Sequence, residues 1–314
     1  MPCVSTHGVI ALRCLIALTL LSAGWAGERP ALAQEPQVVA RSSRVAEEAL
    51  NVRAVTYNIR YNNPGDGENA WPHRKDWVGE LLMAKQADVI GLQEVLHQQY
   101  KDLAERLDGY ESRFVGRDRG DERGEGCPIF FRSERFEAIG YETLWLSETP
   151  TQAGSRGWDA ALPRIVTHLK LRERQTDRIL HVFNTHFDHQ GEEARRNSAK
   201  LIHDLIRDKA GAEPWVAMGD LNALPESVVL GNLLGAENEP PTFVDAREVA
   251  TEVVGPDSTW NGFREVIAER RIDFIVVADD VRVSRLVIDD QSREGRFPSD
   301  HLSVEADLVF STSN

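Results

Sequence analysis

Short apolar segments, each about as long as one buried strand, recur after residue 50, and most have a metal- or phosphate-binding residue type at one end. The residues that follow such segments are Asn58, Glu94, His186, Asp220 and Asn222. Those that precede them are Asp273, Asp300 and His301. Because the amino end of a strand lies beside the carboxyl end of its antiparallel neighbour, all eight side chains can line one edge of the sheets. Gathering so many polar groups costs free energy unless they bind something.

Apolar periodicity predicts more strands than helices. The expected strands are 53–57, 88–92, 128–131, 135–146, 165–171, 179–183, 215–218, 274–277 and 303–309. The expected helices are 77–87, 100–107 and 192–209. The strands 128–131 and 135–146 are close enough in sequence to form a hairpin. Hairpins mixed with strand–helix–strand units indicate an α/β protein with mixed sheets, whose outer faces are covered by helices.

Composition limits the classes of function. The 314 residues are 41% hydrophobic, and no Gly/Ser/Pro-rich break follows residue 51, which favours a single domain. The formal net charge of -14 argues against a protein that coats nucleic acid or anionic membrane non-specifically, since such binding requires clustered Lys and Arg. The three cysteines are too few for a disulfide scaffold.

The first 33 residues have the pattern of a signal peptide. An uncharged apolar run at 14–26 follows Arg13, and Ala-Leu-Ala at 31–33 supplies a small-x-small cleavage site. The run is too short to span a bilayer as a helix, although an uncleaved anchor is the alternative. We therefore expect a signal peptide at 1–33, a linker at 34–50 and a secreted or periplasmic mature protein without an integral membrane segment.

The polar residues at the strand ends favour a hard cation. Carboxylates with few imidazoles and no thiolate are typical ligands of Mg²⁺, with Mn²⁺ or Ca²⁺ as alternatives, rather than of Zn²⁺. A cation held by one or two carboxylates and retaining open positions is a common means of neutralising a phosphate.

Six short segments resemble, in the same order, the motifs of the endonuclease/exonuclease/phosphatase superfamily. They are TYNIR at 56–60, GLQEV at 91–95, NTHFDH at 184–189, GDLNA at 219–223, RIDFI at 271–275 and SDH at 299–301. That superfamily includes deoxyribonuclease I, neutral sphingomyelinases, inositol polyphosphate 5-phosphatases and the deadenylase/nocturnin group. The resemblance implies a catalytic domain at 51–314 that folds as a four-layer α/β/β/α sandwich of two mixed, mainly antiparallel sheets.

The resemblance also implies roles for most of the strand-end residues. Glu94 would bind the metal with Asn58 beside it, and Asp300 would face the metal. His301 would be the general base, and Asp273 would orient it, since a carboxylate sets the tautomer and raises the basicity of an imidazole.

The remaining assignments concern the substrate. By the same resemblance, Asp220 would position the attacking water, and Asn222 and His186 would contact the phosphate. Glu125, seven residues before Arg132, would be the partner of His186.

Several further candidates are open to two interpretations. Arg164 would bind phosphate or form a structural ion pair, and His189 would contact substrate or cap the helix at 192–209. Trp71 would stack on a base or sugar or belong to the core. Arg117 and Arg119 are expected on a solvated surface. The candidates for the rim of the substrate site are Trp158, Trp260 and Phe263.

The predicted function is that of a secreted, divalent-metal-dependent phosphoesterase. We expect in-line attack of water on a phosphorylated small molecule or nucleotide by a monomeric enzyme. A secreted nuclease on DNA or RNA and a sphingomyelinase-like phosphodiesterase are the alternative enzymes. A non-catalytic binding protein on the same fold is the fourth reading, although such a protein is expected to lack at least one of the four residues Glu94, Asp220, Asp273 and His301, all of which are present.

Overall fold

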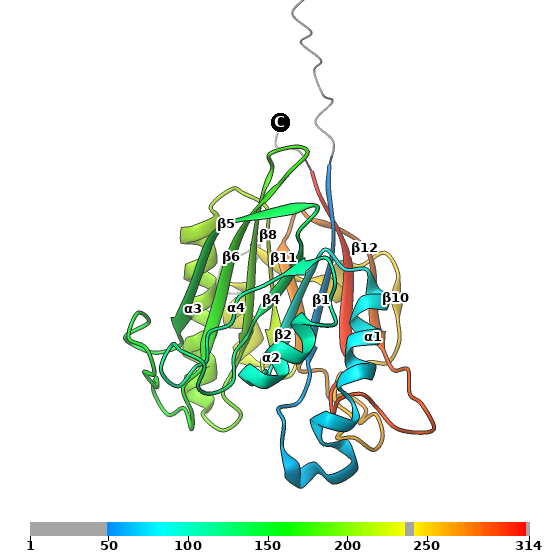
Figure 1. The fold of residues 1–314 in the computed structure, drawn as a ribbon. Coiled ribbons are helices and arrows are strands. Elements are labelled where there is room, and N and C mark those ends of the chain that lie inside the picture. Colours follow the sequence, from blue (N-terminus) through cyan, green and yellow to red (C-terminus); the bar gives the residue numbers. More distant parts are fainter. Residues whose placement is uncertain (1–48, 236–241, 312–314) are drawn as a thin grey trace, which may run out of the picture. The chain divides into compact units, whose positions relative to one another are not determined.

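Two β-sheets form the centre of the protein, which a computed structural model describes over residues 49–235 and 242–311. The seven-stranded sheet has, in spatial order, β10 (Val253–Val254), β12 (Arg282–Asp289), β13 (Ser303–Phe310), β1 (Leu50–Asn58), β2 (Val89–Gln93), β4 (Ile129–Arg132) and β3 (Tyr110–Glu111). The six-stranded sheet has β5 (Phe136–Trp145), β6 (Ile165–Glu173), β7 (Ile179–His186), β8 (Trp215–Asp220), β11 (Asp273–Ala278) and β9 (Phe243–Asp245). Both sheets are mixed and mainly antiparallel (Figure 1).

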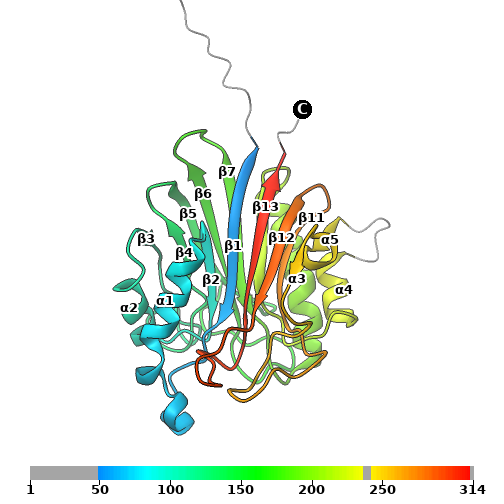
Figure 2. The ribbon, with the colours of Figure 1, turned by 90° about the vertical axis from the view of Figure 1, so that its right-hand side faces the viewer.

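Helices cover the outer faces of both sheets (Figure 2). The seven-stranded sheet is covered by α1 (Lys75–Lys85) and α2 (His97–Ala104), and the six-stranded sheet by α3 (Glu192–Ala210) and α4 (Val228–Leu234). The shorter helical elements are α5 (Ala246–Val249), η1 (Pro64–Asn69) and η2 (Trp71–His73). The four-layer sandwich expected from the sequence is therefore confirmed.

Alternation along each strand divides most of the described apolar residues among three large cores. On β1, Val52 and Ala54 pack between the two sheets, whereas Val55 and Tyr57 pack against α1 and α2. This follows from the two-residue period of a strand, which sends successive side chains to opposite faces. On the other side, Ile202 and Ile206 of α3 contribute to a core with the outer face of the six-stranded sheet. Burial on both faces explains why the central strands are almost entirely apolar.

The strand registers bring the expected polar residues to one edge. Asp220 at the end of β8 lies opposite His186 at the end of β7 and opposite Asp273 at the start of β11. In the other sheet, Asn58 at the end of β1 lies opposite Gln93 at the end of β2. The residues before β13 join this edge because β13 runs antiparallel to β1.

The expected hairpin between 128–131 and 135–146 is wrong. Both strands form, but β4 pairs with β2 and β3, whereas β5 pairs with β6 in the other sheet. Both edges of β4 are thus occupied, and the short turn between the two strands carries the chain from one sheet to the other.

Other details also differ from the periodicity-based prediction, which did not include α4, α5 or the short strands β3, β9 and β10. The helix expected at 100–107 lies at His97–Ala104. The long strand β12 was missed because its register shifts between Val283 and Arg285, which interrupts the alternation of apolar residues. Within residues 49–235 and 242–311, no helix has the length and apolar character needed to cross a membrane. The expected signal peptide at 1–33 and nearly all of the linker at 34–50 lie outside the described residues.

Candidate active site

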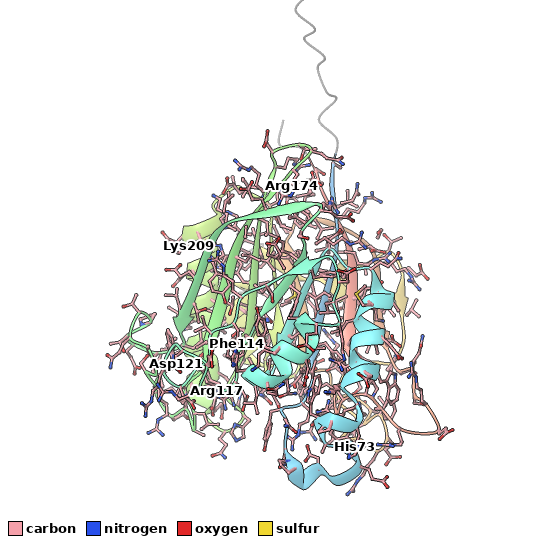
Figure 3. All side chains as sticks on the ribbon, viewed as in Figure 1. His73, Phe114, Arg117, Asp121, Arg174 and Lys209 are labelled. Atoms are coloured by element: carbon pink, nitrogen blue, oxygen red, sulfur yellow. The ribbon has the colours of Figure 1, made fainter. Side chains whose placement is uncertain are left out.

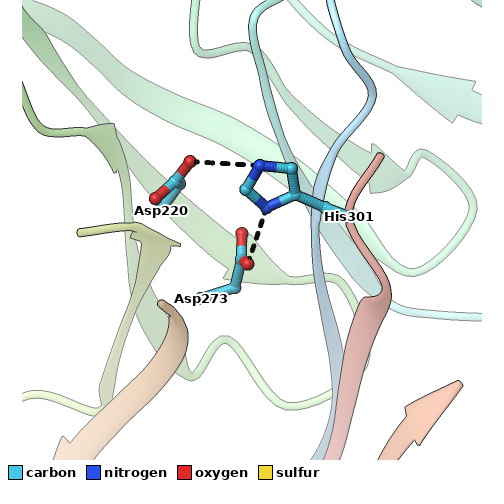
Figure 4. A group of neighbouring side chains, drawn as sticks. All are labelled: Asp220, Asp273 and His301. Carbon is cyan, nitrogen blue, oxygen red and sulfur yellow. Dashed lines mark hydrogen bonds and ion pairs between the residues drawn. The ribbon is translucent and has the colours of Figure 1, made fainter. Parts of the chain in front are cut away.

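A histidine between two aspartates lies at the centre of the shared sheet edge (Figure 4). The His301 Nδ1 atom is 2.8 Å from Asp273 Oδ2, and the Nε2 atom is 3.7 Å from Asp220 Oδ2. All three residues are at most 5% exposed. The cross-strand pairing of Asp220 with Asp273 holds the two carboxylates side by side, and His301 enters from the other sheet just before β13.

This cluster binds protons tightly. Burial opposes a charge on His301, but the charges of Asp273 and Asp220 and the hydrogen bond to Asp273 outweigh it and raise the pKa of His301 to about 10. Burial and the charge of Asp273 raise the pKa of Asp220 to about 7. Asp273 Oδ1 is buried and has no hydrogen-bond partner. The carboxylates at this edge of the sheets therefore carry more negative charge than the neighbouring cationic side chains neutralise.

Asn58 connects the cluster to Glu94. Its Nδ2 donates to Asp220 Oδ2 at 2.9 Å and to Glu94 Oε1 at 3.0 Å, and its Oδ1 accepts from the backbone N–H of Arg60. The second carboxylate oxygen of Glu94 accepts from the N–H of Tyr61 at 3.1 Å. Asn58 therefore positions the Glu94 carboxylate, and its Oδ1 retains a second lone pair with which it could face a cation.

Asp300 faces the same space as Glu94. Each of these carboxylates lies 3.9 Å from the Arg60 guanidinium, which is bound more closely to Asp66 at 3.0 and 3.1 Å. Burial raises the pKa of Asp300, and the charge of Glu94 adds to this effect. Two carboxylates that repel each other at the edge of a cavity are suited to share a cation.

The residues present fit a hard divalent cation in two neighbouring places. One is the space beside Glu94 and Asp300. The other lies among Asp220, Asp273 and His301, whose ligand atoms are all within 4.8 Å of one another. Both sets are rich in carboxylate oxygens, and the unpartnered Asp273 Oδ1 supports the second.

His186 and Asn222 form the opposite wall. Asn222 Nδ2 donates to the Phe187 carbonyl and lies 3.1 Å from His186 Nε2, which therefore accepts and leaves the proton on Nδ1. Burial and the positive charges of Arg164 and Arg117 hold the pKa of His186 well below 6.5. The imidazole is thus neutral, and its 3.5 Å approach to Asp220 is not an ion pair.

The expected pairing of Glu125 with His186 is wrong. Both Glu125 oxygens accept from Arg117, at 2.7 and 2.8 Å. Arg117 was expected on a solvated surface but is buried, whereas Arg119 is exposed as expected. The loop folds back on itself through backbone hydrogen bonds between Arg117 and Glu125 and between Gly126 and Val95. A loop of this kind has no hydrophobic periodicity, so the sequence contained no pattern from which the pairing of Arg117 with Glu125 could be predicted.

Arg164 and His189 both line the cavity and contact each other. Arg164 Nε donates to Asp188 Oδ2 at 3.2 Å, and Nη2 donates to His189 Nδ1 at 3.0 Å. His189 does not cap α3, because Asp159 accepts from the N–H of Ala194 at 2.7 Å.

Trp71 does not reach the cavity. It is 1% exposed within the core under α1 and α2, and its Nε1 donates to Asp102 Oδ2 at 2.8 Å. The indole of Trp71 is therefore a core side chain, and the expected stacking on substrate is wrong. Of the three aromatic residues expected at the rim, Trp260 lines the cavity, with the Arg270 guanidinium 3.9 Å above its ring.

Most of these groups line one cavity of about 440 Å³, whereas Trp71, Asn58 and Asp273 are not part of its lining. Its lining includes residues that sequence analysis did not select, namely Arg60, Tyr61, Leu162, Arg270 and Ile272. Arg60 and Ile272 stand next to strand ends, within two of the quoted motif segments, and that position could have identified them. Tyr61, Leu162 and Arg270 lie in loops without such a signal. A larger cavity, of about 640 Å³, lies beside α1 and β12 and contains none of the candidate site residues.

Residues 55–301 match the model of the Endonuclease/Exonuclease/phosphatase family, and the chain belongs to that family. Its members are hydrolases that act on phosphoesters, and the family depends on divalent metal.

The chain is similar to several solved structures. One is an endonuclease/exonuclease/phosphatase from Bacteroides vulgatus, at 40% identity and a TM-score of 0.79 over 83% of this chain and 100% of that one. Another is a mannosyl-6-phosphatase from Bacteroides thetaiotaomicron VPI-5482, at 31% identity and a TM-score of 0.77 over 82% of this chain and 100% of that one.

Curated relatives are more distant. Nocturnin of Drosophila melanogaster is 24% identical over 86% of this chain and 48% of its own length. The CCR4-NOT transcription complex subunit 6-like-B of Xenopus laevis is 27% identical over 51% of this chain and 37% of its own length. The chain thus spans less than half the length of either relative.

Proposed function

We propose that the protein is a divalent-metal-dependent phosphoesterase that hydrolyses a phosphorylated small molecule, with a sugar phosphate as the first candidate substrate. The observation that carries this proposal is the convergence of His301, which is paired with Asp273, with His186, Asn222 and the carboxylates of Glu94 and Asp300 on one cavity of about 440 Å³. A cavity of this size suits a small ligand. The mannosyl-6-phosphatase, at 31% identity, supports a sugar as the leaving group.

A divalent cation held by Glu94 and Asp300, or by the Asp220–Asp273–His301 group, would polarise the phosphate and stabilise the leaving oxygen. Without a cation, the charges of Asp273 and Asp220 keep His301 protonated, with a pKa of about 10. A cation that neutralises the neighbouring carboxylates would lower this pKa, and His301 Nε2, the nitrogen not bound to Asp273, would then accept a proton from the attacking water. Asp273 orients the imidazole and stabilises its charged form. Asp220 positions the water beside Nε2.

The opposite wall would receive the negative charge. Asn222 and His186 line this wall and would contact the phosphate oxygens during in-line attack. Both N–H bonds of Asn222 Nδ2 are used by the Phe187 carbonyl and His186 Nε2, so Asn222 would exchange one of these partners for the phosphate. The new bond joins the water oxygen to phosphorus, and the bond from phosphorus to the leaving oxygen breaks. A covalent intermediate on Cys127 is not part of this scheme, since burial raises the pKa of its thiol to about 12.

The test is hydrolysis by the purified mature protein with Mg²⁺ or Mn²⁺, followed by phosphate release for the monoesters and by separation of the cleavage products for the diesters. Mannose 6-phosphate, nucleotides, inositol phosphates, sphingomyelin, RNA and plasmid DNA are compared at equal concentrations. We expect the sugar phosphate to be hydrolysed and the polymers to be poor substrates. Lack of turnover on every substrate with both cations would refute the proposal.

Two variants test the catalytic assignments. His301→Ala and Glu94→Ala should each reduce turnover by about a hundredfold or more, the usual scale for loss of a general base or of a principal charge in the site. His73→Ala, which changes an exposed histidine of η2 outside the cavity lining, is the matched control and should retain full activity. Retained activity in either site variant would remove that residue from the mechanism.

A nucleotide is the second candidate substrate. The rings of Tyr61 and Trp260 line the cavity and offer surfaces on which a base could stack. Homologues that act on nucleotide or nucleic acid substrates support this second candidate. Faster turnover of nucleotides than of sugar phosphates in the same substrate panel would favour this reading.

Export of a monomeric mature protein completes the proposal. The charge and apolar pattern of residues 1–33 support it. Amino-terminal sequencing of the protein recovered outside the cytoplasm should begin at Gln34, and light scattering should give the mass of one chain. Recovery of the uncleaved chain in the cytoplasm would contradict export.

A further inference from the structure

Two buried arginines on the His186 side of the cavity each retain a guanidinium N–H without a partner. They are Arg164, which is 4% exposed and has an unpartnered Nη1, and Arg117, which is 7% exposed and has an unpartnered Nε. Both residues line the cavity. Figure 3 shows Arg117 at the end of the sandwich opposite Arg174. A buried charged donor without an acceptor costs free energy, so these N–H groups point to an anionic occupant.

The Arg164 guanidinium is held rigidly. Its partner Asp188 is 1% exposed and accepts from the backbone N–H groups of Ala161, Leu162, Gln190 and Gly191 at 2.8 to 3.3 Å. Asp188 therefore cannot follow Arg164 if the arginine moves. A donor fixed by such support loses little entropy when it binds a ligand.

The ion pair of Arg164 with Asp188 has a fixed orientation relative to the cavity. The guanidinium lines the cavity, whereas the carboxylate of Asp188 lies behind it and is not part of the lining. The two arginines are close enough to His186 to be the strongest charged influences on its pKa, which they lower. The carboxylates of Glu94 and Asp300, which would hold the metal, each lie 3.9 Å from Arg60, and the charge of Glu94 also raises the pKa of Glu125, the partner of Arg117. The cavity thus has a wall with arginine donors beside His186 and a metal-binding wall beside Arg60.

We infer that Arg164, supported by Arg117, selects phosphate monoesters over diesters by binding a terminal phosphate oxygen. A monoester dianion has three terminal oxygens and can present one to each wall while the third meets Asn222. A diester has one terminal oxygen fewer and one negative charge fewer, and its second substituent would have to occupy the space beside the guanidinium. This inference rests on the proposed function and names the substrate class of the same cavity.

The first experiment compares kcat/KM for p-nitrophenyl phosphate and bis-p-nitrophenyl phosphate. The wild-type protein should prefer the monoester. Arg164→Gln should lower kcat/KM about tenfold to a hundredfold for the monoester, the range for one hydrogen bond to a charged group, and less than about threefold for the diester. Arg117→Lys should shift the ratio in the same direction by a smaller factor. Arg119→Gln, an exposed change in the same loop, is the control and should leave the ratio unchanged.

The second readout is the pH dependence of the monoester reaction relative to the diester reaction. The second pKa of a phosphate monoester is about 6, so wild-type kcat/KM for the monoester should rise relative to the diester as the dianion forms. Arg164→Gln should make this increase of relative kcat/KM with pH smaller. Arg164→Lys keeps a positive charge beside Asp188 and should restore part of the increase. A purely structural role of Arg164 would lower both reactions equally at every pH.

The possible failures are distinguishable. If the wild type hydrolyses neither ester, the proposed function fails. If it hydrolyses them and Arg164→Gln leaves the monoester-to-diester ratio unchanged, the inference fails while the proposed function stands. If thermal unfolding shows that Arg164→Gln does not fold, Arg164→Lys and Arg117→Lys decide the question, and an unchanged ratio in both overturns the inference.

Discussion

Strained backbone occurs at residues that line the cavity. Glu94 has φ 59° and Asn222 has φ 46°, a region that residues with a Cβ rarely adopt. Each side chain is held by its own contacts, Glu94 by the N–H of Tyr61 and Asn222 by the Phe187 carbonyl. The positive φ turns both side chains from the sheet edge toward the cavity, and the surrounding hydrogen bonds offset a cost of about 1–3 kcal/mol for each residue.

At the same scale, the cation should stabilise the folded protein. A ligand that binds only the native state adds about 2.7 kcal/mol at a hundred times its Kd, so Mg²⁺ or Mn²⁺ should raise the unfolding temperature. In the Glu94→Gln variant the cation should no longer raise the unfolding temperature, and titration calorimetry of this variant should show no cation binding. EDTA should return the wild type to the temperature of the cation-free protein.

Asp273→Asn separates the two cation positions. If it abolishes the rise while Glu94→Gln retains it, the cation lies among Asp220, Asp273 and His301. In that case the assignment of the cation to Glu94 and Asp300 is wrong.

At the scale of elements, β6 and β7 carry a buried histidine pair beneath α3. The Nε2 atom of His168 lies 2.9 Å from His181 Nδ1, and His181 Nε2 lies 2.7 Å from Glu213 Oε2. The His168 ring stacks on Phe183 with the centroids 4.5 Å apart. Burial, followed by the charges of His181, Lys209 and Lys170, lowers the pKa of His168 to about 3.

This pair predicts a loss of stability in acid. Below about pH 6.5 the unfolded chain binds a proton at His168 that the folded protein does not, so the free energy of unfolding should fall as the pH drops from 6.5 toward 3. The limit for one such group is about 1.4 kcal/mol per pH unit. Urea unfolding of His168→Gln should show a shallower fall than the wild type between these pH values. An equal slope in both proteins would show that His168 does not contribute.

At the scale of the whole molecule, Arg74 joins the segments around the site. Its guanidinium donates to the carbonyls of Asn69, Ile59, Arg60 and Pro298, at 2.5 to 3.0 Å, and the last of these is 224 residues away in sequence. Arg74 is 2% exposed. One side chain therefore fastens the loop after β1 to the loop that precedes His301.

Removing Arg74 should destabilise the protein strongly. Arg74→Ala would leave several buried carbonyls without donors, and we expect a loss of about 3 kcal/mol or more in the free energy of unfolding, measured in urea. Arg74→Lys should rescue little, because an ammonium cannot reach all four carbonyls in one plane. Arg119→Ala, at an exposed position, should change stability by less than about 0.5 kcal/mol. A loss below about 1 kcal/mol for Arg74→Ala would show that the loops are held by other contacts.

Strand patterning made the layers and the sheet edge predictable. A strand has a two-residue period, and neighbouring strands pair in register, so the position of Asp220 after an apolar run sets its place opposite His186 and Asp273. The same reasoning failed for β12, where a bulge breaks the period, and for β4 and β5, where a short turn crosses between sheets.

The sequence by itself determined which side chains reach the shared edge, because each stands at the end of a strand whose apolar pattern can be read along the chain. Only the tertiary structure decided the partners of loop residues: Glu125 binds Arg117 instead of His186, Trp71 is buried against Asp102, and Arg164 faces the cavity with Asp188 behind it. The physical reason is that a loop has no repeating geometry. Its contacts depend on how the chain closes in space and on which buried donors and acceptors remain to be satisfied.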